Sequence, residues 1–215
     1  MNILIIGANG HTGRNLISQL KQNNQHETTA MVREEKQGEE LKELGADHIV
    51  VANLEGDMEH AFTEIDACIF AAGSGSKTGP EKTISVDQEG AKKAIDLAKS
   101  NDIKHFVMLS SVGADSPEVA PEEMRHYLTA KQNADEYLMK SGVPYTIVRP
   151  TSLSNEKEQT LITAKVSLPD KSLTISREAV AKTLIASLTM MEAKNEVFEI
   201  TSGLKEVEEA LKYIH

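Results

Sequence analysis

Short apolar runs alternate along the chain with longer segments in which apolar residues recur every three or four positions. The short runs are typical of buried strands, and the longer segments are typical of amphipathic helices. We expect strands at residues 2–6, 28–32, 48–51, 67–71, 105–109 and 145–148. We expect helices near residues 12–22, 39–44, 84–100 and 122–140. This alternation predicts an α/β fold with a doubly wound parallel sheet, whose ligand crevice lies at the carboxyl ends of the strands.

The last third of the chain is less regular. It predicts a strand at 161–168, a helix at 177–190 capped by Ser176, a strand at 197–200 and a closing helix at 204–214. These pieces are too few for an independent domain, and 215 residues fit a single one. We therefore expect one domain over residues 1–215, with a core at 1–152 and a short lid at 153–215 on the substrate side of the crevice.

A glycine-rich turn follows the first expected strand and runs into the first expected helix. Gly7 permits a tight turn, Gly10 lets backbone approach a pyrophosphate, and Gly13 lets the helix pack closely on the strand. The start of the helix offers free N–H groups and a partial positive charge to phosphates. Because a strand precedes this turn and a second strand follows the helix, a dinucleotide site is favoured over a turn without a ligand. The predicted contacts are Gly7, Asn9, Gly10, His11, Thr12, Gly13 and Arg14.

The Gly-x-x-Gly-x-x-Gly spacing resembles that of the short-chain dehydrogenase/reductase superfamily, in its extended and atypical branches. Other motifs follow in the family's order: Phe70-Ala71-Ala72-Gly73, Val86-Asp87-x-x-Gly90, Leu109-Ser110-Ser111 and Thr146-Ile147-Val148-Arg149-Pro150. The resemblance covers most of residues 1–152 and implies an NAD(P)-binding Rossmann fold. It also implies cofactor contacts at Asn53, Leu54, Ala71, Ala72, Gly73, Ser110, Pro150, Thr151 and Ser152. The family often has Asp where Asn53 stands.

The end of the second expected strand bears on the choice of cofactor. Dinucleotide folds that select NAD usually place an acid there, which would repel a 2′-phosphate. This strand ends in Arg33, whose guanidinium can bind a phosphate through two hydrogen bonds, and Arg14 could assist. In the alternative, Arg33 is a solvated charge beside Glu34 and Glu35. The pattern favours NADP(H) over NAD(H).

One stripe of the helix expected at 122–140 faces the body of the protein. It carries Tyr127, Ala130, Lys131, Ala134, Tyr137 and Leu138. We expect Gln132, Asn133, Asp135 and Glu136 on the other faces. A lysine on a buried stripe needs a reason, because an unpaired buried ammonium is costly.

Tyr127 and Lys131 match the Tyr-x-x-x-Lys active site of the family that the chain resembles. The resemblance implies that Lys131 holds the nicotinamide ribose and lowers the pKa of Tyr127, which donates a proton to a carbonyl oxygen. It implies that Ser111 hydrogen-bonds the same oxygen. In the alternative, Tyr127 is a structural tyrosine and Lys131 extends to solvent. We expect Asp87 to be a capping or solvated carboxylate.

Composition and charge limit the classes of partner and the compartment that we expect. The net charge of −10 argues against nucleic-acid and membrane surfaces, since both are anionic. The one cysteine, Cys68, lies in an apolar run, which points to a reducing compartment and to inert packing. No basic segment precedes the first apolar run, so we expect no signal peptide and a cytoplasmic protein. The seven histidines show no metal-ligand spacing, so we expect no metal.

Three functions stay open. The first is an NADP(H)-dependent oxidoreductase acting on a small molecule, resembling flavin and biliverdin reductases and epimerase/dehydratase-like chains. The second is a non-catalytic NADP(H) sensor of the NmrA type, although such regulators tend to lack the tyrosine that this chain keeps. The third is a sugar epimerase or dehydratase, for which the segment after Pro150 looks short. A homo-oligomer also stays open.

Overall fold

The computed structural model describes residues 1–74, 79–156 and 160–215. Its main sheet is made of β1 (Asn2–Ile6), β2 (Glu27–Val32), β3 (His48–Val51), β4 (Ala67–Phe70), β5 (His105–Leu109), β6 (Tyr145–Pro150), β8 (Ile162–Lys165) and β10 (Glu196–Ser202). The strand order is β3-β2-β1-β4-β5-β6-β10-β8, and all neighbours are parallel except β8 and β10. The first six strands follow the order of the dinucleotide-binding Rossmann fold, which confirms the predicted fold class.

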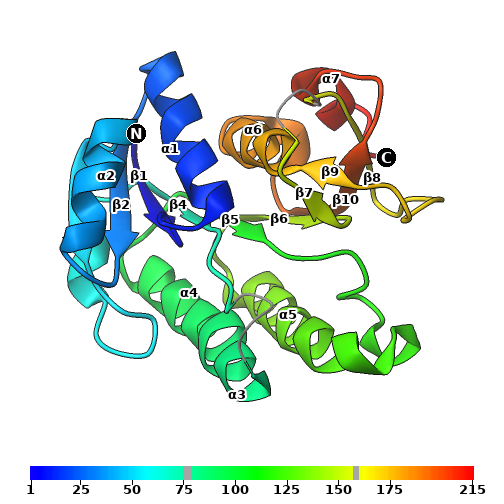
Figure 1. The fold of residues 1–215 in the computed structure, drawn as a ribbon, viewed down its shortest axis with the longest axis horizontal. Helices are drawn as coiled ribbons and strands as arrows, with labels where there is room; N and C mark the ends of the chain where they lie inside the picture. Colours follow the sequence, from blue (N-terminus) through cyan, green and yellow to red (C-terminus); the bar gives the residue numbers. More distant parts are fainter. Residues whose placement is uncertain (75–78, 157–159) are drawn as a thin grey trace.

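Helices cover both faces of the sheet (Figure 1). They are α1 (His11–Asn23), α2 (Lys36–Leu44), α3 (Pro80–Lys82), α4 (Ala91–Ser100), α5 (Glu122–Ser141), α6 (Arg177–Ser187) and α7 (Val207–Leu211). Short 3₁₀ segments lie at η1 (Glu59–Phe62), η3 (Pro117–Val119) and η4 (Met191–Ala193). The helix expected at 84–100 starts earlier than predicted and is divided, because a π-helical segment, η2 (Thr83–Gly90), separates α3 from α4.

Two hydrophobic layers hold the sheet between the helices. Successive strand residues point to opposite faces. Ile3 and Ile5 therefore pack under α1 and α6, whereas Leu4 and Ile6 pack under α4 and α5. Because both faces are covered, the central strands read as continuous apolar runs, the pattern from which they were predicted.

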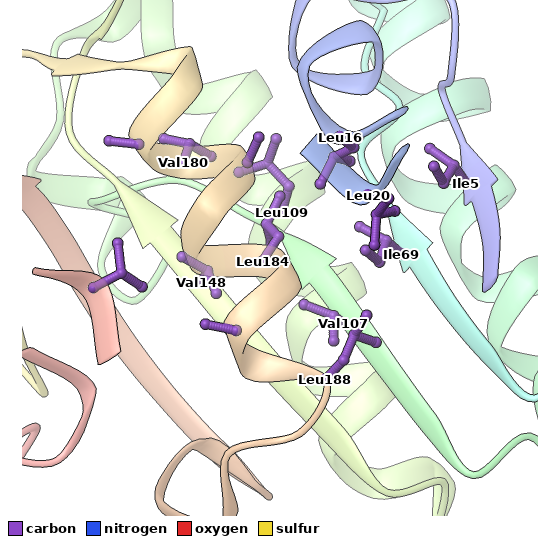
Figure 2. Packing of buried hydrophobic residues seen from close by; sticks show 14 of the residues in the cluster. Ile5, Leu16, Leu20, Ile69, Val107, Leu109, Val148, Val180, Leu184 and Leu188 are labelled. Atoms are coloured by element: carbon purple, nitrogen blue, oxygen red, sulfur yellow. The ribbon is translucent and has the colours of Figure 1, made fainter. Parts of the chain in front are cut away.

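The structure corrects the prediction that residues 153–215 form a lid. β10 joins the sheet beside β6, and β8 joins it beside β10. Figure 2 shows α6 packed across the same face of the sheet as α1, with Val180 and Leu184 directed at the strands. The segment thus completes the core. Among the described residues of this segment, the two-residue strands β7 (Leu153–Ser154) and β9 (Ile175–Ser176) form a separate small sheet.

The strand order places a crevice above β1 and β4. The chain leaves β1 toward β2 and β3 on one side, whereas β4, β5 and β6 lie on the other side. Ligands of open α/β sheets bind at such a switch point, outside the carboxyl ends of the strands. No helix in the described parts of the chain is long and apolar enough to cross a membrane.

The role of α6 in the core predicts the effect of Leu184→Ala. Leu184 is fully buried between α6 and the sheet. Its truncation removes buried methyl groups and leaves a cavity, so the free energy of unfolding should fall by about 2 to 5 kcal/mol. Urea denaturation measures this change. The control is Leu204→Ala, because Leu204 is 91% exposed and its truncation should cost less than about 0.5 kcal/mol. Equal effects of the two substitutions would mean that α6 is only peripherally attached.

Candidate functional site

The glycine loop between β1 and α1 is built by backbone contacts that leave no room for side chains. Gly7 has φ of +89°, and a Cβ there would lie 2.6 Å from the backbone nitrogen of Ala72. A Cβ on Gly13 would lie 2.3 Å from the carbonyl oxygen of Gly7. The first turn of α1 therefore sits directly against the end of β1, as the spacing of the glycines predicts.

Gly10 differs from the other two glycines of the loop. The nearest atom to a Cβ on Gly10 would be the carbonyl oxygen of Gly7, at 3.2 Å. Gly10 is also the N-cap residue of α1, and no described side chain caps this helix end. The first turn carries no acidic residue. Amide groups and the positive end of the helix dipole thus remain available to an anion at this point.

A cavity of about 340 Å³ opens beside this loop. Most of its lining comes from the ends of β1, β2, β3 and β4, and α2 and α3 add Gln37 and Lys82. The lining at the strand ends includes Gly7, Asn9, Gly10, Arg33, Asn53, Leu54, Glu55, Ala71, Ala72, Gly73 and Ser74. A space of this size lies within the usual range for small-molecule and cofactor sites. The structure therefore gathers nine of the predicted contacts, from four separate segments, around one space.

The charges at the β2 end of the cavity are mainly cationic. The backbone N–H of Arg33 donates to Gln37, and its exposed side chain lines the cavity. Glu55 is the acidic residue of the lining, and both of its carboxylate oxygens accept from Lys82 Nζ, at 2.9 and 2.7 Å. This ion pair holds the pKa of the Glu55 carboxyl below its usual value. The Glu55 carboxylate is thus paired with Lys82. Among the described residues, no carboxylate lies within salt-bridge distance of Arg33.

Three of the predicted contacts, Arg14, Asn9 and Asn53, make local hydrogen bonds within the protein. Arg14 donates to Asn9 Oδ1 at 2.6 Å and pairs with Glu40 at 2.5 Å, so it holds the glycine loop. Asn53 Oδ1 accepts from the backbone N–H of Glu55 at 3.1 Å and shapes the turn after β3. His11 is exposed, and Thr12 is buried in the first turn of α1.

The last group of predicted contacts lies beyond the lining of this cavity. Thr151 is buried, and its hydroxyl donates to Thr201 at 3.0 Å. Pro150 and Ser152 bond through their carbonyl oxygens to the backbone N–H groups of Val112 and Ile175. Pro150 ends β6, and Thr151 and Ser152 follow it directly, but their polar groups bond to neighbouring residues of the sheet and its loops.

The two serines that follow β5 have different surroundings. Ser110 is buried, and its hydroxyl donates to Asp135 Oδ2 at 2.8 Å. Ser111 is half-buried, and its hydroxyl donates to the carbonyl oxygen of Val112 at 3.2 Å. The hydroxyl of Ser110 is thus committed to a buried carboxylate, whereas that of Ser111 is held by one carbonyl oxygen.

Lys131 is buried on the inner stripe of α5, as its spacing predicts. Its ammonium lies 5.8 Å from the centre of the Tyr127 ring, which is half-buried one turn earlier. Nζ also lies 3.1 Å from Asp87 Oδ1 and donates to the carbonyl oxygen of Leu109 at 3.3 Å. The alternative in which Lys131 extends to solvent is wrong.

The helical pattern predicts the wrong position for one residue of the site, Asp135. The pattern puts it on an outer face of α5, yet it is fully buried. Its Oδ2 atom lies 2.9 Å from an Nη atom of Arg149 on β6 and also accepts from Ser110. Burial raises the pKa of this carboxyl, against the opposing effect of Arg149. The signal that could have located it is Arg149, a cation in an otherwise apolar strand that requires a buried partner.

Two chemistries receive no support. Cys68 is buried in β4, and burial raises the pKa of its thiol far above neutrality, so it is not a nucleophile. Within residues 1–74, 79–156 and 160–215, no group of three or more histidine, cysteine, aspartate or glutamate side chains could hold a metal ion.

Comparison with known proteins adds a family and several relatives. The model of an NAD(P)H-binding family matches residues 7–190. An uncharacterized sugar epimerase of Bacillus subtilis, YhfK, is 43% identical, over 99% of both chains. Sanguinarine reductase of Eschscholzia californica is 29% identical, over 99% of this chain and 93% of its own. Among solved structures, a proposed NAD-dependent epimerase/dehydratase from Bacillus halodurans has a TM-score of 0.96 and 45% identity, over 99% of both chains.

The loop geometry predicts different outcomes for alanine at two of its glycines. Gly13→Ala forces a methyl group into backbone atoms, so it should destabilise the fold by about 1 to 3 kcal/mol. Gly10→Ala meets only one atom, a backbone oxygen at 3.2 Å, and should lower the melting temperature much less than Gly13→Ala. Thermal denaturation of the two variants checks this. A Gly13→Ala protein as stable as the parent would contradict the tight packing of α1 on β1.

Proposed function

This chain belongs to the NAD(P)H-binding family, and from that premise we propose that it is an NADP(H)-dependent oxidoreductase of the atypical short-chain dehydrogenase/reductase type. Its substrate is a small molecule with a reducible group. The observation that supports the proposal is the chain of contacts that links the lining of the glycine-loop cavity to the buried Lys131. The loop Ala71–Ser74 lines the cavity, and Asp87, which accepts from the N–H of Ser74, also contacts the ammonium.

The residues around the cavity fit a dinucleotide. Gly10 and the uncapped start of α1 suit a pyrophosphate, since an amide-rich surface with little steric cover favours an anion. Leu54, Ala71 and Ala72 supply an apolar surface for the adenine. Bound NADPH supplies a hydride. The chain's own groups then bind, orient and protonate the substrate.

Three side chains carry the proposed chemistry. Lys131 binds the nicotinamide ribose hydroxyls, and its ammonium lies 5.8 Å from the centre of the Tyr127 ring. Tyr127 donates the proton to the substrate's carbonyl oxygen, and Ser111 donates a hydrogen bond to the same atom. An acid in this position contributes about 10²- to 10⁴-fold to the rate.

We assign the preference for NADP(H) to Arg33. Its guanidinium lies at the end of β2, where a 2′-phosphate would be recognised, and the carboxylate of the lining is already paired with Lys82. Arg14 contributes indirectly, by holding Asn9.

A second candidate function is suggested by the names of two relatives. The relatives from Bacillus subtilis and Bacillus halodurans are named after sugar epimerases and epimerase/dehydratases. Oxidation and re-reduction of a sugar would use the same Tyr127 and Lys131. The sanguinarine reductase relative favours net reduction instead. A nucleotide-sugar assay that detects an epimer without net NADPH consumption separates the two. The sensor hypothesis is less favoured, because Tyr127 is retained beside Lys131.

Arg33→Ala should reduce the preference for NADPH over NADH. Loss of a charged hydrogen-bond donor costs about 10- to 100-fold in NADPH affinity and leaves NADH affinity nearly unchanged. Thermal shifts with each dinucleotide measure this, since ligand at a hundred times its Kd stabilises a protein by about 2.7 kcal/mol. Lys36→Ala is the control, because it removes an exposed cation that pairs with Glu34. If NADH matches NADPH in the parent protein, the assignment of Arg33 fails.

Tyr127→Phe should lower the rate of carbonyl reduction by about 10²- to 10⁴-fold and leave NADPH affinity intact. Lys131→Met should lower both the rate of carbonyl reduction and the affinity for NADPH. Quinones, flavins and aldehydes form the first substrate panel, with NADPH oxidation followed by absorbance. Tyr137→Phe is the matched control. Tyr137 also lies on α5, but its hydroxyl donates to the exposed Asp96 on α4. Undiminished turnover in Tyr127→Phe would exclude this tyrosine as the acid.

A further inference from the structure

Asp87 occupies an interior position that its sequence context does not predict. It lies in η2, and its side chain is 0% exposed, rather than capping a helix or contacting solvent. Oδ2 accepts from the backbone N–H of Ser74 at 2.8 Å. Oδ1 lies 3.1 Å from Lys131 Nζ and forms no hydrogen bond within the described residues. One carboxylate thus contacts both the loop after β4 and the lysine of α5.

The charges around Lys131 identify Asp87 as its counter-ion. The other nearby carboxylate, Asp135, is already bound by Arg149 and Ser110. The side chain of Lys131 is 5% exposed, and its ammonium also donates to the carbonyl oxygen of Leu109. An ammonium buried to this extent is strongly disfavoured without a paired carboxylate.

The shape of η2 supports this placement. Insertions of π-helical turns are rare and frequently occur at functional sites. Here the segment lies along α5 and packs against the loop after β4, where the hydroxyls of Thr83 and Ser74 are 3.2 Å apart. A Cβ on Gly73 would lie 3.2 Å from Asp87 Oδ1, so the loop is closely packed on the carboxylate. Gly73 and Ser74 are part of the cavity lining.

We propose that Asp87 is a positioning residue that ties the cofactor-contacting loop Ala71–Ser74 to Lys131 and holds the two in a fixed relation. This inference rests on the proposed function, because it treats the loop and the lysine as two parts of one NADPH site. Asp87 acts through these two elements and does not itself touch the reacting atoms. Its charge keeps the ammonium in place, and its second oxygen keeps the loop in place.

The pairing also sets the protonation of Lys131. Burial lowers the pKa of this amine, while Tyr127 and Asp135 on α5 and Asp87 on η2 raise it, and the net direction is upward. Arg149 on β6 faces Asp135 rather than the amine. Lys131 is therefore charged throughout the neutral range. Without the negative charge of Asp87, fewer negative charges offset the effect of burial on Lys131. The pKa of Lys131 therefore falls, and the amine loses its proton as pH rises.

Asp87→Asn separates the two contacts, because an amide oxygen can still accept from Ser74 whereas the negative charge is lost. NADPH binding is followed by its fluorescence from about pH 6.5 to about pH 9.5. We expect affinity about 10- to 100-fold below the parent at alkaline pH and a smaller loss at acid pH, the size expected for one charged hydrogen bond. The parent should bind evenly over this range. Asp96→Asn, an exposed change of the same charge on α4, should behave as the parent.

The outcomes distinguish failure of the proposed NADPH-binding function from failure of the positioning role of Asp87. A parent protein that does not bind NADPH overturns the proposed function. A parent that binds, with Lys131→Met weakened and Asp87→Asn unchanged at every pH, overturns only the role of Asp87. If Asp87→Asn does not fold, the double variant Asp87→Asn/Lys131→Met decides. Recovery of folding supports the pairing, since both buried charges are then gone, and continued failure to fold contradicts it.

Discussion

The direct contact between the first turn of α1 and the end of β1 is the constraint on which the site depends. At Gly7 and Gly13 the backbones approach so closely that a methyl group on either would overlap neighbouring backbone atoms. This contact aims the start of α1 at the space above β1 and β4, where the strand order also opens the crevice. The cavity, its amide-rich wall and the lining from β2, β3 and β4 all follow from that placement.

A second constraint comes from charges buried at α5. Two ion pairs, Lys131 with Asp87 and Arg149 with Asp135, join α5 to η2 and to β6. Breaking such pairs from one side is costly, and their net contribution to stability is often small. Buried ion pairs therefore fix the relative positions of elements more than they add to the stability of the fold. In this protein they fix a lysine, a serine-tipped strand and a cavity loop relative to one another.

Much of this arrangement could be predicted from the sequence. The apolar runs located the six strands that carry the site, the glycine spacing located the turn, and the helical stripe located Lys131. The role of β8 and β10 could not be predicted, because strands that contain buried polar residues such as Glu199 and Thr201 read as surface segments. Nor could Asp87 and Asp135 be placed, because a buried carboxylate looks like a solvated one until its cationic partner is located. Long-range pairing, not local pattern, decides such positions.

A structure determined with bound NADPH tests the central claim most directly. The account predicts the pyrophosphate at the start of α1 against Gly10, the 2′-phosphate within reach of Arg33, and the nicotinamide ribose hydroxyls within hydrogen-bond distance of Lys131 Nζ. The nicotinamide ring should then lie beside the hydroxyl of Tyr127. A dinucleotide bound away from the glycine loop, or one whose nicotinamide end lies far from Lys131, would contradict it.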